Sequence, residues 1–211
     1  MSGIMLNLVG GTFVSIPAIG SVLGGGFFAG QINQSGTIYN LIVGPVASAQ
    51  TINQKYKDDN SDTPGANSVI DGPQNTADIV ADGDAGLYPA AHFCNNLVIG
   101  GFSDWYLPAK NELEVCYYNL KPTTSSNNTS SGTNTNAVPS RGSNYTAGTP
   151  AQTSATDFKD TGAEDFAVQF YWSSTEASAA NAWNQYFANG YQQSSQKQGR
   201  RNVRAVRRVA A

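Results

Sequence analysis

The chain has 211 residues, a formal net charge of −3 and a charged fraction of 13%, about half the share in an average soluble protein. This length allows one large or two small domains with a hydrophobic core. The weak net charge gives no general attraction to nucleic acid, and no apolar run approaches the roughly 18 to 20 residues of a membrane helix. We therefore expect neither nucleic-acid binding nor membrane insertion. The neutral polar composition is typical of loop-rich, β-containing extracellular or virion proteins.

Residues 1–18 predict an uncharged N-terminal arm, and residues 19–211 a separate domain. The arm contains Ile4, Met5, Leu6, Leu8 and Val9, then glycines, then Phe13-Val14-Ser15-Ile16-Pro17. Such a segment would expose apolar surface in water, so we expect it to dock onto another protein. A disordered terminus or an edge strand of the chain's own domain is the alternative. The first eleven residues lack the positive n-region of a signal peptide, so we expect any exit from the cell to use another route, such as lysis.

A β-hairpin and two helices are predicted next. Residues 24–32 and 37–44 predict two strands joined by the turn-forming residues 33–36. The first helix begins near Asn75, breaks at the glycines of 83–86 and resumes over 89–97. The second begins at Pro108 and ends near Leu120. Its core-facing stripe has helical spacing and consists of Leu113, Cys116, Tyr117 and Leu120.

The remaining segments predict a long loop followed by strands. Residues 122–157 are rich in Thr, Ser, Asn, Gly and Pro and predict a surface loop. Residues 166–172 predict a strand, and two or three more strands complete the chain. In the motif at residues 100–113, Trp105 and Leu107 are expected to build core, whereas Asp104 is expected to accept backbone hydrogen bonds.

The reactive residue types indicate binding rather than catalysis. Cys94 and Cys116 are expected to be buried thiols, with a disulfide between packed helices as the alternative. The single His92 excludes a multi-histidine metal site, and no Ser-His-Asp set or carboxylate pair is visible. We therefore expect no enzyme activity, no catalytic residue, no metal site and no cofactor. The Asp- and Asn-rich residues 50–74 could bind calcium, but their spacing does not fit an EF-hand, and a solvated turn is the alternative.

Half of the twelve basic residues lie within the last fifteen positions, namely Lys197, Arg200, Arg201, Arg204, Arg207 and Arg208. One interpretation is a strand whose outward arginines pair with acidic loops. The alternative is an anion-binding or glycan-binding surface. DNA binding is not expected, because no basic helix or nucleic-acid-binding motif accompanies these charges.

About twenty-five residues between two strand signals have the composition of a recognition surface. They follow the motif at 171–176, precede the strand signal at 202–209, and are rich in Asn, Gln, Ser, Tyr, Trp, Ala and Gly. Tyr and Trp give large contact areas with little loss of conformational entropy, while Ser, Asn and Gly give adaptable hydrogen bonds. A display surface held between two strands favours a binding function.

Four motifs connect the sequence with a known family. They are the segment 100–113 (Gly-Gly-Phe-Ser-Asp-Trp-Tyr-Leu-Pro-Ala-Lys-Asn-Glu-Leu), the segment 171–176 (Tyr-Trp-Ser-Ser-Thr-Glu), Phe187 with Gly190, and the segment 203–208 (Val-Arg-Ala-Val-Arg-Arg). Over roughly residues 18–211 the chain resembles the Lcl C-terminal-domain family, named for a collagen-like bacterial adhesin. The resemblance implies an α+β, C-type-lectin-like fold. Two helices would pack on a small twisted antiparallel sheet with long loops, preceded by the short arm.

The C-terminal region also resembles the variable proteins of phage diversity-generating systems, which present variable side chains to host receptors. Trp172, Phe187, Val203 and Val206 would then be scaffold. The sugar-binding triplets of calcium-dependent lectins, Glu-Pro-Asn and Gln-Pro-Asp, are absent. By this resemblance the ligand-binding positions are Asn181, Trp183, Asn184, Tyr186, Asn189, Tyr191, Gln192, Gln193, Ser194 and Ser195.

These resemblances imply a phage virion protein, such as a tail-fibre or receptor-binding tip, assembled in the host cytoplasm. The arm resembles short leaders of phage tail and fibre proteins and would dock onto another virion protein. The expected partners are two further copies in a homotrimer and a host receptor or glycan. The alternative is an extracellular bacterial surface adhesin that binds polyanionic glycans through its C-terminal arginines.

Overall fold

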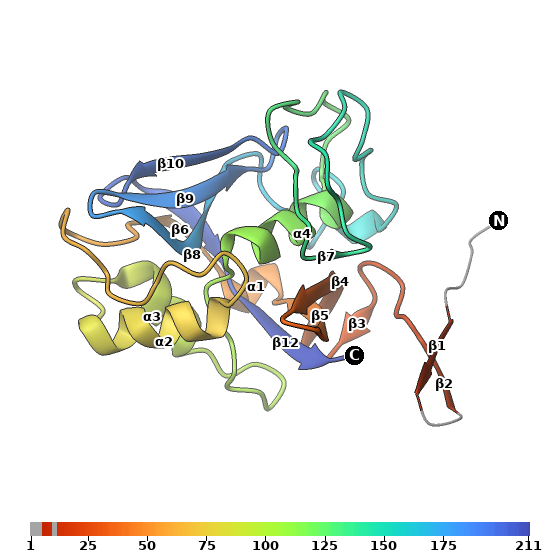
Figure 1. Cartoon of the computed structure of the whole chain (residues 1–211), viewed down its shortest axis with the longest axis horizontal. Helices are drawn as coiled ribbons and strands as arrows, with labels where there is room; N and C mark the ends of the chain where they lie inside the picture. The colour runs from red at the N-terminus through yellow and green to blue at the C-terminus, as the bar shows by residue number, and fades with distance from the viewer. Residues whose placement is uncertain (1–5, 10–11) are drawn as a thin grey trace.

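The computed structural model describes residues 6–9 and 12–211, and two five-stranded sheets dominate it (Figure 1). The first sheet has the order β10-β9-β8-β11-β6. Its strands are β6 (Gln50–Gln54), β8 (Phe170–Ser178), β9 (Asn181–Tyr186), β10 (Gln192–Gln196) and β11 (Arg201–Arg204). The second has the order β12-β5-β4-β3, with β7 paired to β4. Its strands are β3 (Val22–Leu23), β4 (Gly26–Gln34), β5 (Thr37–Val43), β7 (Ala137–Val138) and β12 (Val206–Ala210).

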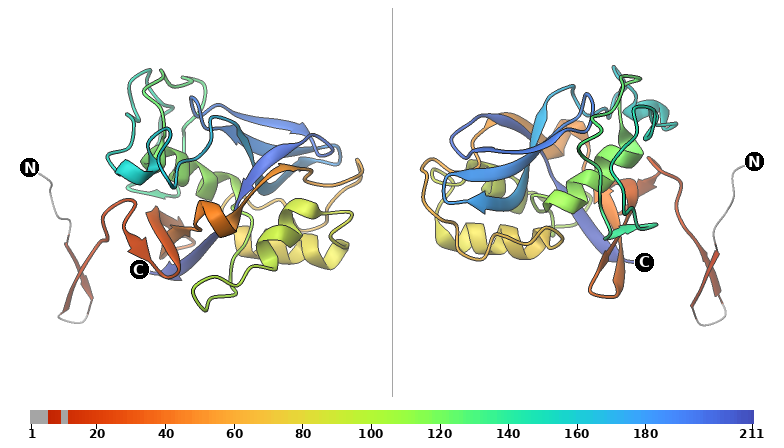
Figure 2. Two further views of the ribbon diagram at one scale, coloured as in Figure 1. Left: turned by 180° about the vertical axis from the view of Figure 1, so that it is seen from behind. Right: turned by 45° about the horizontal axis from the view of Figure 1, so that its top comes forward.

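The helices are short and fill the space beside and between the sheets. They are α1 (Val46–Ala49), α2 (Gly72–Asp82), α3 (Pro89–Asn95) and α4 (Lys110–Leu120), with a 3-10 turn at Thr156–Phe158. Helix α4 contacts β4 and β5 of one sheet and β8 and β9 of the other (Figure 2). Helices α2 and α3 pack together, and α2 also contacts β8. One core therefore surrounds α4, and a second lies where α2 and α3 meet the first sheet.

The expected α+β, C-type-lectin-like architecture is wrong, because the fold is mostly β-sheet with small helices. The expectation placed all strands in one small antiparallel sheet. Instead the last strands divide between two sheets at Ala205: its N–H donates to the Ala49 carbonyl, and its own carbonyl accepts from Gly44 N–H. These bonds lie outside the rows of hydrogen bonds that join the strands of either sheet, so the two sheets separate at Ala205. Strand β11 pairs with β6 and β8, while β12 pairs with β5. The pairing of β11 with β8 is parallel, so the first sheet is also mixed rather than antiparallel.

Several local predictions are confirmed. Strands β4 and β5 form the expected hairpin, and Ser35 and Gly36 at its turn have φ angles of 52° and 95°. All four stripe residues of α4 are buried, as are Trp105 and Leu107. Helix α2, however, begins earlier than expected: Asp71 caps it, whereas Asn75 is buried and bonded to Ser68 and Ser174.

Two other segments differ in detail from the predictions. The predicted strand at 166–172 begins only at Phe170, because Phe166 turns into the core and stacks on Phe187 at 4.1 Å between ring centroids. Among the described residues, Asp104 accepts from Arg207 Nε at 2.7 Å rather than from a backbone amide. The arm at residues 1–18 includes strands β1 (Leu6–Val9) and β2 (Thr12–Ser15), which pair with each other. Residues 1–5 and 10–11 of the predicted docking arm lie outside the described residues.

The segment 122–157 has little regular structure, as predicted, but its inner side is buried and tied to α4. The fully buried Glu114 carboxylate accepts hydrogen bonds from Asn134 Nδ2 at 2.6 Å and from the Tyr145 hydroxyl at 2.8 Å, and it pairs with Arg141. Asn127 adds further bonds to the Thr146, Ala147 and Pro150 carbonyls. A long polar loop is thereby held as a defined surface rather than as a mobile connection.

Replacing Glu114 by Ala should loosen this loop. The donors on Asn134, Arg141 and Tyr145 would lose their common acceptor, and buried donors left without partners destabilise the local structure. Local opening of residues 131–146 would then cost about 1.4 kcal/mol less. We therefore expect the amides of these residues to exchange with deuterium roughly tenfold faster than in the wild type, measured by mass spectrometry. Peptides from β4 and β5 serve as the internal control. Equal exchange in both proteins would contradict the assigned role of Glu114.

A second buried carboxylate, Glu112, makes the fold sensitive to pH. It accepts from Ala109 N–H at 2.8 Å and from the Tyr106 hydroxyl at 2.9 Å, and it faces Arg208. Burial nevertheless raises the pKa of Glu112 to about 7. The folded chain then holds this proton more tightly than the unfolded chain, so the contribution of Glu112 to stability falls as pH rises from 4.5 to about 7.

The Glu112→Gln variant should lack this pH dependence. Its unfolding free energy relative to the wild type should rise by roughly 3 kcal/mol between pH 4.5 and 7, measured by urea denaturation at several pH values. The Asp62→Asn variant removes an exposed carboxylate and should retain the wild-type profile. If the unfolding free energies of the Glu112 variant and the wild type change with pH in parallel, Glu112 is not the source of the pH dependence.

Candidate functional site

The predicted display residues lie on and beside the β9–β10 hairpin at the edge of the first sheet (Figure 1). Its register pairs Trp183 with Ser194 and Asn184 with Gln193. Because successive side chains of a strand point to opposite faces, these two pairs lie on opposite sides of the sheet. The display residues therefore form two surfaces with different chemistry rather than one.

The first surface carries Trp183, whose ring is covered by Lys110. The Lys110 ammonium lies 3.8 Å from the centroid of the Trp183 ring, a favourable cation–π distance. Both residues line a hollow of about 180 Å³, here termed the Trp183 hollow, together with Ser131, Asn144 and Gln192. Burial lowers the pKa of Lys110. Helix α4 supplies Lys110, the long loop supplies Ser131 and Asn144, and the hairpin supplies the rest.

The opposite surface carries Tyr186, stacked on Phe170 of β8 with 4.6 Å between ring centroids. The Arg201 guanidinium lies 5.3 Å from the Phe170 centroid. Beside this stack is a hollow of about 440 Å³, here termed the Arg201 hollow. Its lining includes Ile52, Asn53, Gln169, Phe170, Arg200 and Arg201.

Four of the six C-terminal basic residues are used within the fold. Arg204 pairs with Glu164 at 2.9 Å, Arg207 with Asp104 at 2.7 Å, and Arg208 with Asp71 at 3.0 Å. Lys197 pairs with Glu176. The interpretation of arginines paired with acidic residues is therefore confirmed for these positions, although Arg204 and Arg207 are buried rather than outward-facing.

Arg200 and Arg201 differ from the other four. Within residues 6–9 and 12–211, no carboxylate lies at ion-pairing distance from either. Arg200 donates to the Asn53 carbonyl at 2.7 Å, and Arg201 donates from Nη1 to the Arg200 carbonyl at 2.9 Å. The Nε atom of Arg201 is buried and has no hydrogen-bond partner among the described residues, and burial lowers the pKa of its guanidinium. Two unneutralised cations thus line one hollow.

The structure uses the predicted display positions unevenly. Trp183 and Gln192 line the Trp183 hollow, and Tyr186 supports the Arg201 hollow through Phe170. Asn184 is buried, with Oδ1 lacking a partner. The other positions lie along the hairpin without lining either hollow: Asn181 bonds to Ser178, Asn189 accepts from Tyr191 N–H, and Gln193, Ser194 and Ser195 follow along β10.

Sequence reasoning missed Lys110, Asn144 and Phe170 as site residues. Lys110 falls in a motif that otherwise builds core, and Asn144 lies in a low-complexity loop. Both reach the hairpin only through contacts between segments far apart in the chain. Phe170 falls within the strand predicted at residues 166–172, where no sequence signal marks a binding surface.

The cysteines are buried thiols, and metal-ligating residue types are scattered in the described part of the chain. Cys94 and Cys116 are free and buried, as predicted, and burial raises the pKa of both thiols. Among the residues searched, no three His, Cys, Asp or Glu side chains are grouped to hold a metal ion. In the same part of the chain, no helix has the length and apolar character needed to span a bilayer.

Comparison with known proteins places this geometry in a family. A crystal structure of a fimbrial protein from Bacteroides ovatus ATCC 8483 aligns with a TM-score of 0.43 and 12% identity, covering 79% of this chain and 35% of that one. This chain thus spans about a third of that protein. A search of curated proteins gives no match. The family model described as the Lcl C-terminal domain matches residues 54–207, which include β7 to β11, all of α2 to α4, and Lys110, Arg200 and Arg201 of the two hollows. The chain therefore belongs to the Lcl C-terminal domain family.

Proposed function

We propose that this chain is the ligand-binding domain of a surface or appendage adhesin and that it binds polyanionic glycans at the Arg201 hollow. The observation that carries the proposal is the contrast among the C-terminal basic residues. Four are neutralised by carboxylates, whereas Arg200 and Arg201 line a hollow without such partners in the described chain. Membership of a family named for an adhesin supports a role in attachment.

The chemistry of the hollow suits sulfate and carboxylate groups on a sugar. A guanidinium presents a planar set of donors that can bind two oxygens of one anion. The stacked rings of Phe170 and Tyr186 limit the movement of the Arg201 side chain from one side. The exposed Ile52 adds an apolar surface against which the carbon face of a sugar ring can pack. Binding should therefore combine charge attraction with ring contact.

The other expected properties belong to the same proposal. The domain would act by binding alone, without catalysis, cofactor or calcium. Assembly as a homotrimer and docking through residues 1–18 would place several copies of the hollow on one appendage. Weak sites on one rigid assembly can bind a repeating glycan simultaneously, which raises the overall affinity.

A second candidate function is a receptor-binding tip of a phage virion. The position of the hairpin favours it: β10 is the outer strand of its sheet, and the side chains of Ser194 and Gln196 are exposed. The exposed side chains of this neutral hairpin can change without disturbing the core. Such a protein would be found in the virion rather than at the bacterial surface.

Removing the two arginines of the Arg201 hollow should weaken polyanion binding strongly. We expect the Arg200→Ala, Arg201→Ala double variant to bind heparin at least roughly tenfold more weakly, a loss of about 1.4 kcal/mol or more. Arg201→Lys should give an intermediate affinity because it keeps the charge but loses the planar donors. Affinity can be measured by surface plasmon resonance on immobilised heparin, with uncharged dextran as the ligand control.

A matched protein control is Lys159→Ala, which removes one positive charge that lies outside the Arg201 hollow. It should bind heparin as the wild type does. Full heparin affinity in the double arginine variant would show that the Arg201 hollow is not the polyanion site. An equal loss of heparin affinity in Lys159→Ala would show the same.

The phage alternative has its own test on the hairpin. In a virion that carries this protein, replacing Trp183, Tyr186 and Tyr191 together by Ala should abolish attachment to host cells while particles still assemble. The aromatic rings provide most of the apolar contact area that the hairpin offers. Val98→Ala, an exposed site outside the hairpin, is the matched control. Unchanged adsorption of the triple variant would exclude the receptor-binding function.

A further inference from the structure

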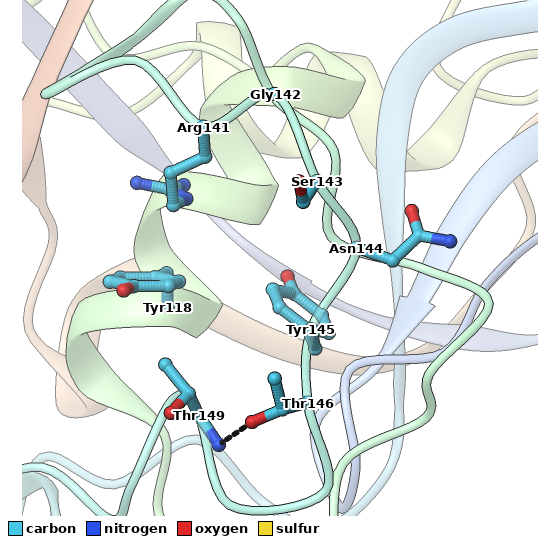
Figure 3. Close-up of a pocket in the computed structure, with 8 residues that line it drawn as sticks. All are labelled: Tyr118, Arg141, Gly142, Ser143, Asn144, Tyr145, Thr146 and Thr149. Atoms are coloured by element: carbon cyan, nitrogen blue, oxygen red, sulfur yellow. Dashed lines mark hydrogen bonds between the residues drawn. The ribbon is translucent and has the colours of Figure 1, made fainter.

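A third hollow lies beside the Trp183 hollow, on the long loop (Figure 3). It has a volume of about 270 Å³ and is lined by Tyr118, Arg141, Ser143, Asn144, Tyr145 and Thr149. Figure 3 shows Arg141 over one face of Tyr118, with the guanidinium carbon 3.9 Å from the ring centroid, and Tyr145 to one side. This space is here termed the Tyr118 hollow.

The two hollows are neighbours because Asn144 lines both. Its amide points away from Tyr118 in Figure 3, and its Oδ1 accepts from the Thr133 hydroxyl at 2.7 Å. Thr133 itself lines the Trp183 hollow. Asn144 is therefore the shared boundary of the two hollows, and the line of lining residues from Tyr118 past Asn144 to Trp183 is here termed the path. Each end has an aromatic ring covered on one side by a basic side chain.

The walls of this path are fixed before any ligand binds. Tyr145 N–H donates to the Ser131 carbonyl at 2.8 Å, which joins the two sides of the loop. The Ser131 hydroxyl accepts from Gln192 N–H at 3.0 Å, which joins the loop to β10. The buried Glu114 holds Arg141 and Tyr145 from beneath. Preformed walls reduce the entropy lost on binding.

The charges along the path are largely balanced, unlike those of the Arg201 hollow. Arg141 is paired with Glu114, although its Nε atom is buried without a partner. Between the two ends the lining consists of hydroxyl and amide groups, chiefly Ser143, Asn144 and Thr133. Such groups both donate and accept hydrogen bonds, as sugar hydroxyls require, and aromatic rings at the ends suit the C–H faces of sugar rings.

We infer that the Tyr118 and Trp183 hollows form one groove for a neutral oligosaccharide, separate from the polyanion site on the opposite face of the sheet. One sugar unit would contact the edge of Tyr118 and another would contact Trp183. Asn144, placed between them, would bond to the linking units. The groove requires no charge on the ligand, so its occupancy does not depend on the proposed function of the Arg201 hollow.

The three tryptophans provide a direct test. Trp105 and Trp172 are buried, with exposed fractions of 2% and 0%, whereas Trp183 is partly exposed beside the groove. Protein labelled with 5-fluorotryptophan should give three ¹⁹F resonances, and Trp183→Phe identifies the one from Trp183. The probes are tetrasaccharides of β-1,4-glucose, α-1,4-glucose, β-1,4-N-acetylglucosamine and α-1,6-mannose. At least one should shift the Trp183 resonance and leave the other two in place.

Variants along the groove then test whether the two hollows act together. Asn144→Ala changes an exposed loop position, and Tyr118→Ala removes the ring at the other end of the path. Each variant should bind the active tetrasaccharide roughly tenfold more weakly or worse, a loss of about 1.4 kcal/mol. Val98→Ala lies outside the groove and should bind as the wild type does. The shift should also persist in 0.5 M NaCl, a salt concentration at which charge-driven binding is strongly weakened.

Two results would overturn the inference. One is the absence of any shift of the Trp183 resonance with all four tetrasaccharides at about 10 mM, a concentration that detects even affinities near 1 mM. The other is a shift that Asn144→Ala and Tyr118→Ala leave unchanged, because the ligand would then contact Trp183 outside the groove. Retained heparin binding in the folded groove variants would confirm that the two sites are separate.

Discussion

The structure depends on the way that its last ten residues join the two sheets. Ala205 bonds to Gly44 and Ala49 instead of to a neighbouring strand, so β11 before it and β12 after it belong to different sheets. Since β6 follows α1 directly, the same crossing also fixes where β6 meets β11. Arg204, Arg207 and Arg208 then hold this segment to Glu164, Asp104 and Asp71. The two sheets are thus fixed relative to each other by backbone bonds and by the ion pairs of three largely buried arginines on one short segment.

These ion pairs explain why a basic C-terminus gives so little free positive charge. Removing one partner of a buried pair costs several kcal/mol because the other charge is left without compensation, so such arginines are constrained by the fold. Arg204 is the clearest example: it is almost fully buried, and burial lowers the pKa of its guanidinium to about 10 despite the neighbouring Glu164. Only arginines outside these pairs are available to a ligand. The functional importance of a basic cluster therefore depends on its partners rather than on its size.

The sequence predicts the local elements of this protein better than their arrangement. Helical spacing identifies the buried face of α4, and the turn residues identify the β4–β5 hairpin, because both signals arise within about ten residues. The division of the last strands at Ala205 leaves no such local signal, so one sheet was expected where two exist. The candidate site shows the same limit. Trp183 and Gln192 are predicted by the resemblance to variable phage proteins, whereas Lys110 and Asn144 reach them only through the folded loop.

The alternation of side chains along one hairpin explains how this domain can offer two kinds of surface. Trp183 and Asn184 are neighbours in sequence, yet a strand directs them to opposite faces. One face meets the rigid loop held by Glu114 and presents hydroxyl, amide and aromatic groups. The other meets β11 and presents Arg201 beside stacked rings. Because Trp172 of β8 and Phe187, directly after β9, anchor this region in the core, the exposed side chains on either face can change without altering the opposite one. A single hairpin can therefore support a salt-dependent contact on one side and a neutral contact on the other, and the two can change independently.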